Sequence, residues 1–295
     1  MDDFPRADEG TLREAMKRAA ALNRVVAVHA ESQEITHQLT AELVAQSRAT
    51  VRDYLASRPV RAELDAIRRA LALAAETGCR LHIVHVSCGT GVAAIVEATR
   101  AGVPVTCETC PHYLVLTEDD MARLGASAKC APPLRAAGEQ DGLWDCLKTG
   151  NISTIGSDHS PSPPAMKAGD NFFKVWGGIS GVQHTLPLLL TEGHQHKIAL
   201  PVLARLFAAN VVKTFDLPRT KGRIESGADA DLALVDLTGA FTIERHGLLD
   251  RHRQTPYVGR RLTAKVVQTI LRGRTIFKNG RIVAEATGKL VAPPR

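Results

Sequence analysis

Aromatic residues and long apolar runs are both scarce in this sequence. Phe, Trp and Tyr make up 4% of its 295 residues, which leaves few side chains to stack on nucleic-acid bases. The mean hydropathy is −0.07, and no uncharged apolar stretch reaches the length of a membrane span. The first residues lack a basic segment followed by an apolar one, so we expect no secretory signal peptide.

Neither the net charge nor the cysteine content indicates a nucleic-acid-binding, membrane-binding or disulfide-rich protein. The net charge is +6, but basic and acidic residues are mixed along the predicted helices, as in residues 61–76. This pattern is typical of a solvated surface, and we expect no nucleic-acid or membrane partner. Six cysteines in a chain of this length do not form a disulfide scaffold. We therefore expect reduced thiols and a cytoplasmic location.

Strand and helix signals alternate through the first two thirds of the chain. Apolar, β-branched runs predict strands at residues 25–28, 81–84, 103–107 and 153–156, with helical periodicity between them. This order predicts an α/β fold built from parallel βαβ units. A TIM-type barrel is favoured over a doubly wound open sheet because no Gly-rich phosphate loop follows any strand.

Local signals locate several boundaries. Thr11 and Glu14 have the spacing of a capping box at the start of the first helix, and Gly78 is a stop signal for the long helix before the second strand. From about Lys221 the chain becomes β-rich. Asn279-Gly280 lies between two apolar runs and predicts a hairpin. The expected organisation is a barrel domain at residues 1–220 and a β domain at residues 221–295.

Three side chains with metal-binding chemistry follow predicted strands, namely His29, His85 and Asp158. Imidazole and carboxylate bind zinc and similar divalent ions, and the carboxyl ends of barrel strands carry the chemistry of TIM barrels. Alternation along the second strand predicts that His85 points inward and His82 points toward the helices. Spacing alone leaves open whether these groups bind metal or are hydrogen-bonded structural residues.

Five motifs resolve this ambiguity because they occur together and in order. They resemble the cyclic amidohydrolases, a family that includes allantoinase, hydantoinase/dihydropyrimidinase and dihydroorotase. Segments 176–183, 186–193, 256–259 and 269–273 are similar to the allantoinase branch, and the resemblance covers essentially the whole chain. The five motifs are Val26–Glu31, His82–Ser87, Thr106–Tyr113, Lys129–Arg135 and Gly156–Pro161.

The resemblance implies a metal-dependent hydrolase, with allantoin opened to allantoate in purine catabolism. It implies that His29 and His85 bind a centre of two divalent ions, most simply zinc, and that Asp158 binds metal and shuttles the proton. A hydroxide held between the metals would attack the ring amide carbon. A hydantoinase or dihydropyrimidinase is the alternative enzyme, and a non-catalytic relative is the alternative from another class.

The resemblance also implies substrate contacts through two loops. Cys130 and Ala131 lie on one, and Ser180 and Gly181 on the other, with loop packing as the alternative role. Ala131 stands where relatives often carry Ser, so only a backbone contact is expected there. Ser180 stands where dihydropyrimidinases carry Asn, which favours the allantoinase branch. His159, beside Asp158, is expected to support that carboxylate.

Two elements of the family pattern do not precede His29. These are a His-x-His pair on the first barrel strand and a lysine on the fourth, carboxylated to bridge the metals. The only His-x-His is at residues 194–196, and Lys17 lies within a predicted helix. We therefore expect a partial barrel of about strands five to eight with part of the β domain. Two alternatives follow, of which we favour the first: a fragment of an active enzyme, or a short protein that is inactive or completed by a partner chain. The intact enzyme is expected to be a homo-oligomer, most simply a tetramer, that acts on a small cyclic ureide.

Overall fold

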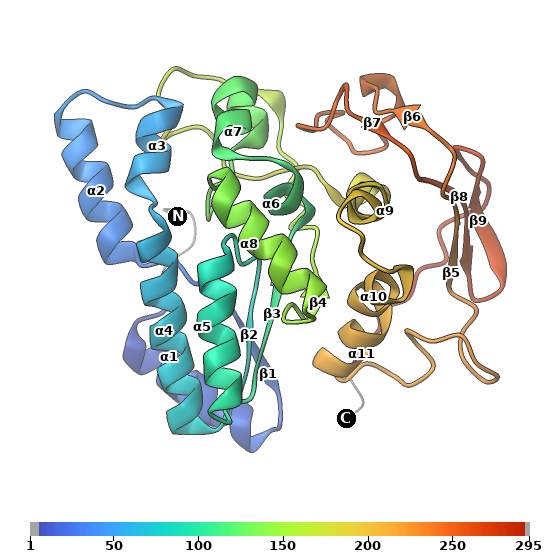
Figure 1. The fold of residues 1–295 in the computed structure, drawn as a ribbon, viewed down its shortest axis with the longest axis horizontal. Helices are drawn as coiled ribbons and strands as arrows, with labels where there is room; N and C mark the ends of the chain where they lie inside the picture. Colours follow the sequence, from blue (N-terminus) through green and yellow to red (C-terminus); the bar gives the residue numbers. More distant parts are fainter. Residues whose placement is uncertain (1–5, 293–295) are drawn as a thin grey trace. The chain divides into compact units, whose positions relative to one another are not determined.

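The computed structural model describes residues 6–292 and divides the chain into two compact units (Figure 1). The first comprises the chain up to Val182 together with Asp250–Pro256, and the second comprises Gln183–Leu249 and the residues from Tyr257 onward. Helices 185–214 therefore group with the C-terminal strands. The domain boundary expected at residues 220/221 stays a prediction.

A parallel sheet forms the centre of the first unit. Its order is β1 (Val25–Val28), β2 (Arg80–Ile83), β3 (Val105–Thr109) and β4 (Thr154–Ile155). The predicted parallel βαβ organisation is confirmed, although β3 begins two residues later than expected. Because parallel strands end at the same edge, the residues that follow β1, β2 and β4 lie at one edge of this sheet.

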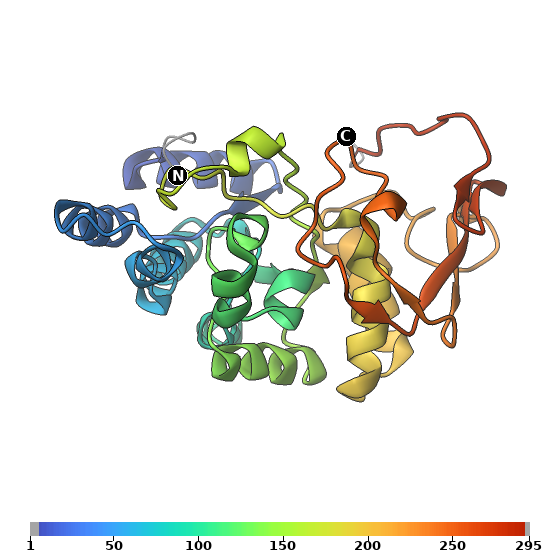
Figure 2. The ribbon, with the colours of Figure 1, turned by 90° about the horizontal axis from the view of Figure 1, so that it is seen from above.

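Helices α4, α5 and α8 lie along the sheet in Figure 1, and Figure 2 gives the view from above. Their inward faces supply much of the core, with Ile67, Leu143 and Trp144 almost completely buried. Burial of such faces is the main favourable term for the unit. The helical elements of the unit are α1 (Glu9–Ala21), α2 (Gln33–Ala45), α3 (Val51–Ser57), α4 (Val60–Thr77), α5 (Gly89–Arg100), α6 (Pro111–Val115), α7 (Glu118–Leu124), η1 (Gly125–Ala128), α8 (Ala137–Lys148) and η2 (Pro164–Lys167).

Helix ends test the predicted boundaries. Gly78 ends α4 with a φ of 68°, as predicted, because glycine tolerates this left-handed conformation. The capping box predicted at Thr11 is wrong. Asp8 caps α1 instead, and its carboxylate accepts a hydrogen bond of 2.7 Å from the Thr11 backbone N–H. The earlier carboxylate satisfies this otherwise unpaired donor, so the helix begins at Glu9.

The second unit combines short helices with antiparallel strands. Its four-stranded sheet has the order β10-β9-β8-β5, and β6 pairs with β7. Asn279 and Gly280 connect β9 to β10 with φ of 49° and 83°, which confirms the predicted hairpin turn. The elements are η3 (Val182–His184) at the unit boundary, α9 (Thr185–Gln195), α10 (Leu200–Ala204), a π-helical turn η4 (Arg205–Ala209), α11 (Asn210–Thr214), β5 (Leu232–Asp236), β6 (Phe241–Thr242), η5 (Arg245–Gly247), β7 (Arg261–Leu262), β8 (Lys265–Leu271), β9 (Arg274–Lys278) and β10 (Arg281–Ile282).

Across residues 6–292, we find no helix whose length and apolar character would let it cross a membrane.

A close helix crossing gives the first prediction. A Cβ atom on Gly89 of α5 would lie 2.8 Å from the Gly142 backbone of α8. We expect Gly89→Ala to lower the free energy of unfolding by about 1–3 kcal/mol because the helices must move apart. Gly138→Ala is the matched control, since a Cβ there meets no atom within 4 Å. Urea unfolding measures both, and equal midpoints for the two variants would contradict the close crossing.

Candidate functional site

The candidate site lies where β1, β2 and β4 end. His29 follows β1 directly, His85 lies two residues beyond β2, and Asp158 lies three residues beyond β4. His85 and Asp158 have φ of 40° and 42°, a left-handed conformation that is costly for residues other than glycine. Such strained residues are concentrated at functional sites, where the surrounding structure maintains them.

The conformation of His85 corrects one prediction. The directions predicted for His82 and His85 required strand alternation to continue to residue 85, but β2 ends at Ile83 and His85 has a positive φ. His82 instead contacts two side chains on the neighbouring strand, with Nδ1 2.8 Å from Thr106 Oγ1 and Nε2 3.3 Å from Glu108 Oε2. It is fully buried, in keeping with the structural role expected for it.

His29 and His85 point toward each other. Nδ1 of His29 lies 3.0 Å from Nε2 of His85, and the rings meet edge to face. Two nitrogens bound tetrahedrally to one Zn²⁺ at about 2.0–2.1 Å would lie roughly 3.3 Å apart. Burial, followed by the neighbouring His29, lowers the pKa of His85. A neutral imidazole has the lone pair that a metal ligand needs, so the pair fits one divalent ion.

Asp158 lies beside this pair but does not complete a ligand set here. It lines the same pocket as both histidines, and its side chain is exposed. Among the described residues, no group of three His, Cys, Asp or Glu side chains has the spacing of a metal site. The histidine pair is thus the part of the predicted ligand set that the geometry brings together, and Asp158 as a ligand stays a prediction.

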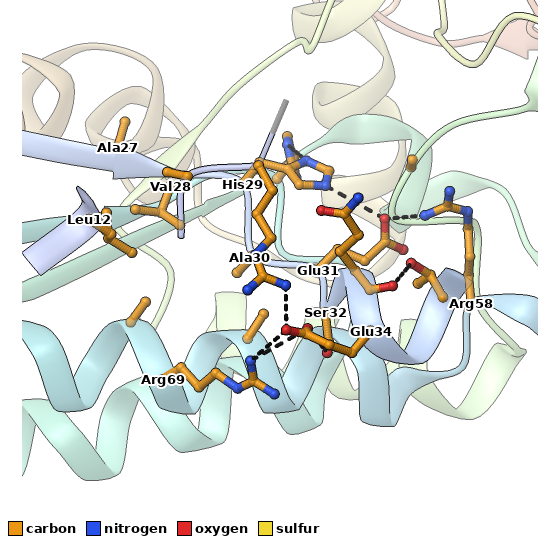
Figure 3. Close-up of a pocket in the computed structure, with 18 of the residues that line it drawn as sticks. Leu12, Ala27, Val28, His29, Ala30, Glu31, Ser32, Glu34, Arg58 and Arg69 are labelled. Carbon is orange, nitrogen blue, oxygen red and sulfur yellow. Dashed lines mark hydrogen bonds and ion pairs between the residues drawn. The ribbon is translucent and has the colours of Figure 1, made fainter. Parts of the chain in front are cut away.

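The pocket at this edge has a volume of about 640 Å³ and lies within the first unit (Figure 3). Of the predicted site residues, His29, His85, Ala131 and Asp158 line it. Its wall also includes Trp176, Gly177 and Gly178, which belong to a family motif but had no predicted role. A concave pocket with a few polar groups is the usual form of a small-molecule site.

The other predicted residues lie next to the pocket lining. Cys130 is buried, and its carbonyl accepts a 2.8 Å hydrogen bond from the Tyr54 hydroxyl. The Ser180 carbonyl accepts one of 2.7 Å from Thr255 Oγ1. Nδ1 of His159 accepts a 3.2 Å hydrogen bond from the Gly181 backbone N–H. In this structure His159 therefore fixes the Gly181 loop, which is a different role from the expected support of Asp158.

Glu31 is a site residue whose role was not predicted from the sequence. Its side chain is 4% exposed, Oε2 lies 3.6 Å from His29 Nε2, and the same oxygen pairs with Arg58 Nη1 (Figure 3). Burial opposes ionisation, but the His29 contact and Arg58 outweigh it, so the pKa of Glu31 is lowered. An ionised Glu31 favours a proton on His29 Nε2 and leaves Nδ1 free to face His85. Its position two residues after His29 was the available signal.

A second buried pair supports the loop after His85. Glu63 at the start of α4 accepts hydrogen bonds of 2.8 Å from the Ser87 backbone N–H and from Arg135 Nη2. Arg135 also donates to Ser87 Oγ at 2.8 Å and to the Arg58 carbonyl. Glu63 and Arg135 are 1% and 7% exposed. Every charge in this network is paired, which burial of charged groups requires.

The network predicts a large stability effect. Glu63→Gln leaves the Arg135 guanidinium buried without its counter-charge, and we expect it to lower the free energy of unfolding by about 3–5 kcal/mol. The control is Glu14→Gln, which removes an exposed pair with Lys17 and should change the free energy of unfolding far less, because water and salt screen exposed pairs. Chemical denaturation measures both. A cost for Glu63→Gln no larger than that of the control would exclude the supporting role of the network.

Known proteins resemble the chain over nearly its whole length. It is 53% identical to an allantoinase from Rubrobacter xylanophilus and 49% identical to one from Deinococcus radiodurans, each alignment covering 99% of this chain. Among solved structures, L-hydantoinase from Arthrobacter aurescens superposes with a TM-score of 0.95 at 34% identity and covers 98% of this chain. A D-hydantoinase from Thermus superposes with a TM-score of 0.93 at 25% identity, over 97% of this chain.

The chain spans only part of each relative. It covers 64% of the Rubrobacter protein and 65% of the Arthrobacter chain. The fold is an α/β amidohydrolase fold similar to that of the hydantoinases. The model of the "Amidohydrolase family" matches residues 3–276. This match, the identities and the superpositions confirm the resemblance inferred from the motifs, and the chain belongs to the amidohydrolase family.

Proposed function

We propose that this chain contributes the active site of a cyclic amidohydrolase that opens allantoin to allantoate in purine catabolism. The observation that carries the proposal is the facing pair His29 Nδ1 and His85 Nε2 in a 640 Å³ pocket. The choice of allantoin is supported by relatives that are named as allantoinases and reach 53% identity. The chain spans 64% of that relative.

We propose that the first unit corresponds to about strands five to eight of a (β/α)8 barrel. The four parallel strands with helices between them support this assignment. Residues 1–220 would form the partial barrel domain and residues 221–295 the C-terminal segment of a small β domain. The antiparallel sheet of β5, β8, β9 and β10 supports the latter.

We assign His29 and His85 to hold a divalent ion, most simply Zn²⁺, with Asp158 as a further ligand. The complete centre would contain two ions and a carboxylated lysine, and among the described residues no lysine lines this pocket. When bound, such ions lower the pKa of water and polarise a carbonyl oxygen. Glu31 orients His29 for this purpose through its contact with Nε2.

Asp158 is the proposed proton shuttle. As water adds to the ring carbonyl carbon, a carboxylate oxygen of Asp158 accepts its proton. The ring C–N bond then breaks, and Asp158 returns the proton to the departing nitrogen, which yields the open ureide. One carboxyl group in the pocket wall can act as base and then as acid, because each step moves the same proton.

Substrate recognition would use the two loops expected from the resemblance. The backbone of Ala131, which lines the pocket, is the best-supported contact. Cys130, Ser180 and Gly181 would contribute main-chain groups beside it, and the hydrogen bond from Gly181 to His159 would keep that loop in place. Buried polar contacts of this kind discriminate between ring amides because an unmatched group is costly.

The superpositions favour one alternative substrate class. Hydantoinases and dihydropyrimidinases are among the solved structures similar to this chain, so hydantoin or dihydrouracil is the second candidate. A non-catalytic family member is the alternative from another class. Retention of the facing histidines, with strained backbone at His85, supports catalysis over that alternative.

The remaining proposals concern partners and location. We propose a small cyclic ureide as the partner of the pocket, a homo-oligomer for the intact enzyme, and no nucleic-acid or membrane partner. We propose a cytoplasmic location because the six cysteines are free thiols, a state typical of reducing compartments.

Metal binding can be tested on this chain directly. We expect Co²⁺ or Zn²⁺ to bind with one ion at the histidine pair, and His29→Asn or His85→Asn to weaken binding by roughly tenfold or more because each removes a ligand. His194→Asn is the control, since that histidine is exposed on α9. Isothermal titration calorimetry measures the affinities. Unchanged affinity in both ligand variants, or two tightly bound ions in this chain, would contradict the assignment.

Substrate turnover tests the proposed reaction. In the zinc-loaded protein expressed from the complete gene, we expect allantoin to be hydrolysed faster than hydantoin or dihydrouracil. At saturating zinc, Asp158→Asn should lower kcat by about 10²–10⁴-fold, because the proton shuttle is lost. Faster turnover of dihydrouracil or hydantoin would favour the second substrate class. No turnover of any of the three would support a non-catalytic relative.

A further inference from the structure

The pocket wall at Trp176–Gly178 belongs to an irregular segment. Residues 160–181 contain the short 3-10 turn η2, a turn at residues 172–174 and an isolated bridge from Ile179 to His159, but no longer helix or strand. The backbone that lines the pocket is therefore fixed by a few separate hydrogen bonds and not by a continuous ladder. Gly178 has a φ of 155°, and a Cβ atom there would lie 2.8 Å from the Ser160 carbonyl oxygen, so the wall packs tightly against its own first residues. Side-chain donors add to these few backbone contacts.

Two lysines bind this segment through its main chain. The ammonium groups of Lys129 and Lys167 each donate three hydrogen bonds, and all six acceptors are backbone carbonyl oxygens. An ammonium has three N–H donors, so each group uses its full capacity. The acceptors of Lys129 are Phe172 at 2.6 Å, Phe173 at 3.2 Å and Val175, and those of Lys167 are Ala126 at 2.9 Å, Trp176 at 3.1 Å and Gly178 at 2.6 Å.

The surroundings of Lys129 stabilise its buried positive charge. Its residue is 4% exposed, and Nζ lies 4.6 Å from the centre of the Tyr54 ring and 5.2 Å from that of Phe172. Aromatic faces stabilise a cation that has left water. The Lys129 carbonyl also accepts a 2.7 Å hydrogen bond from the Gly178 backbone N–H. Lys129 therefore contacts the segment through both its side chain and its main chain.

The surroundings of Lys167 stabilise its positive charge less well than those of Lys129. Burial lowers its pKa to about 8, whereas the facing Cys130 acts in the opposite direction. Burial also raises the pKa of the Cys130 thiol to about 12, so that thiol stays neutral at pH 8. The three carbonyls favour the ammonium, so its titration should fall between about 8 and the ordinary 10.5. A neutral Lys167 amine has only two N–H donors for the three carbonyl oxygens. It also loses the positive charge that strengthens its hydrogen bonds.

We infer that Lys129 and Lys167 are positioning residues for the pocket wall, with Lys129 holding residues 172–175 and Lys167 holding Trp176 and Gly178. Lys167 acts only while it is protonated, because its deprotonation releases Trp176 and Gly178, which line the pocket together with Asp158 and Ala131. The contacts by which the two lysines hold the wall do not depend on the proposed function. Only the expected effect on substrate binding rests on it.

Hydrogen exchange of backbone amides tests the positioning without any substrate. In Lys167→Met we expect the amides of Trp176 and Gly178 to exchange roughly tenfold faster or more, the effect of losing hydrogen bonds to a charged donor. Exchange in α4 should stay unchanged. Lys17→Met, at an exposed lysine of α1, is the matched control. Unaltered exchange at residues 176–178 in Lys167→Met would overturn the inference.

The pH dependence separates positioning from a general structural effect. After correction for the intrinsic pH dependence of exchange, the wall amides of the wild-type protein should exchange faster as the pH rises from about 8 to 10.5. Lys167→Arg, which keeps its charge, should abolish this increase. An increase that persists in Lys167→Arg would exclude Lys167 as its cause. In the active enzyme, Lys167→Met should raise KM more than it lowers kcat. Absence of turnover would contradict the proposed function alone, because hydrogen exchange tests the wall without substrate.

Discussion

The buried ion pair between Glu63 and Arg135 is the constraint on which the site depends. Both charges have left water, so each must be fully paired, and the partners available to them are in the loops at the edge of the sheet. Glu63 fixes Ser87, two residues after His85, and Arg135 fixes the carbonyl of Arg58. Arg58 in turn pairs with Glu31, which contacts His29. One network thus sets the backbone beside both histidines.

This arrangement stores unfavourable energy at the pocket. His85 and Asp158 have positive φ. Backbone strain of this kind costs on the order of 1–3 kcal/mol per residue. The strained conformations persist because the packed helices and the ion network fix their surroundings. A concentration of such costs at one edge of the sheet is typical of a functional site.

Much of the fold could be predicted from local patterns. The parallel strands, the end of α4 at Gly78 and the hairpin at Asn279-Gly280 each follow from residues close together in sequence. The start of α1 could not be predicted in this way, because both Asp8 and Thr11 can cap a helix. The stronger acceptor, Asp8, lies three residues before Thr11. The motifs identified His29 and His85 as candidates, but their facing geometry depends on a positive φ at His85 that alternation does not reveal. The Lys129 contacts join residues 43 to 46 positions apart. Lys167 lies 9 and 11 positions from Trp176 and Gly178, but the segment between them has no helix or strand period that would reveal these contacts.

The central claim is that His29 and His85 together bind one divalent ion at the edge of the parallel sheet. A crystal of this chain soaked in a zinc salt and measured at the zinc absorption edge tests it most directly. We predict an anomalous peak about 2.0–2.1 Å from both His29 Nδ1 and His85 Nε2. A zinc peak bound elsewhere, with the two imidazoles still 3.0 Å apart and without metal between them, would contradict it.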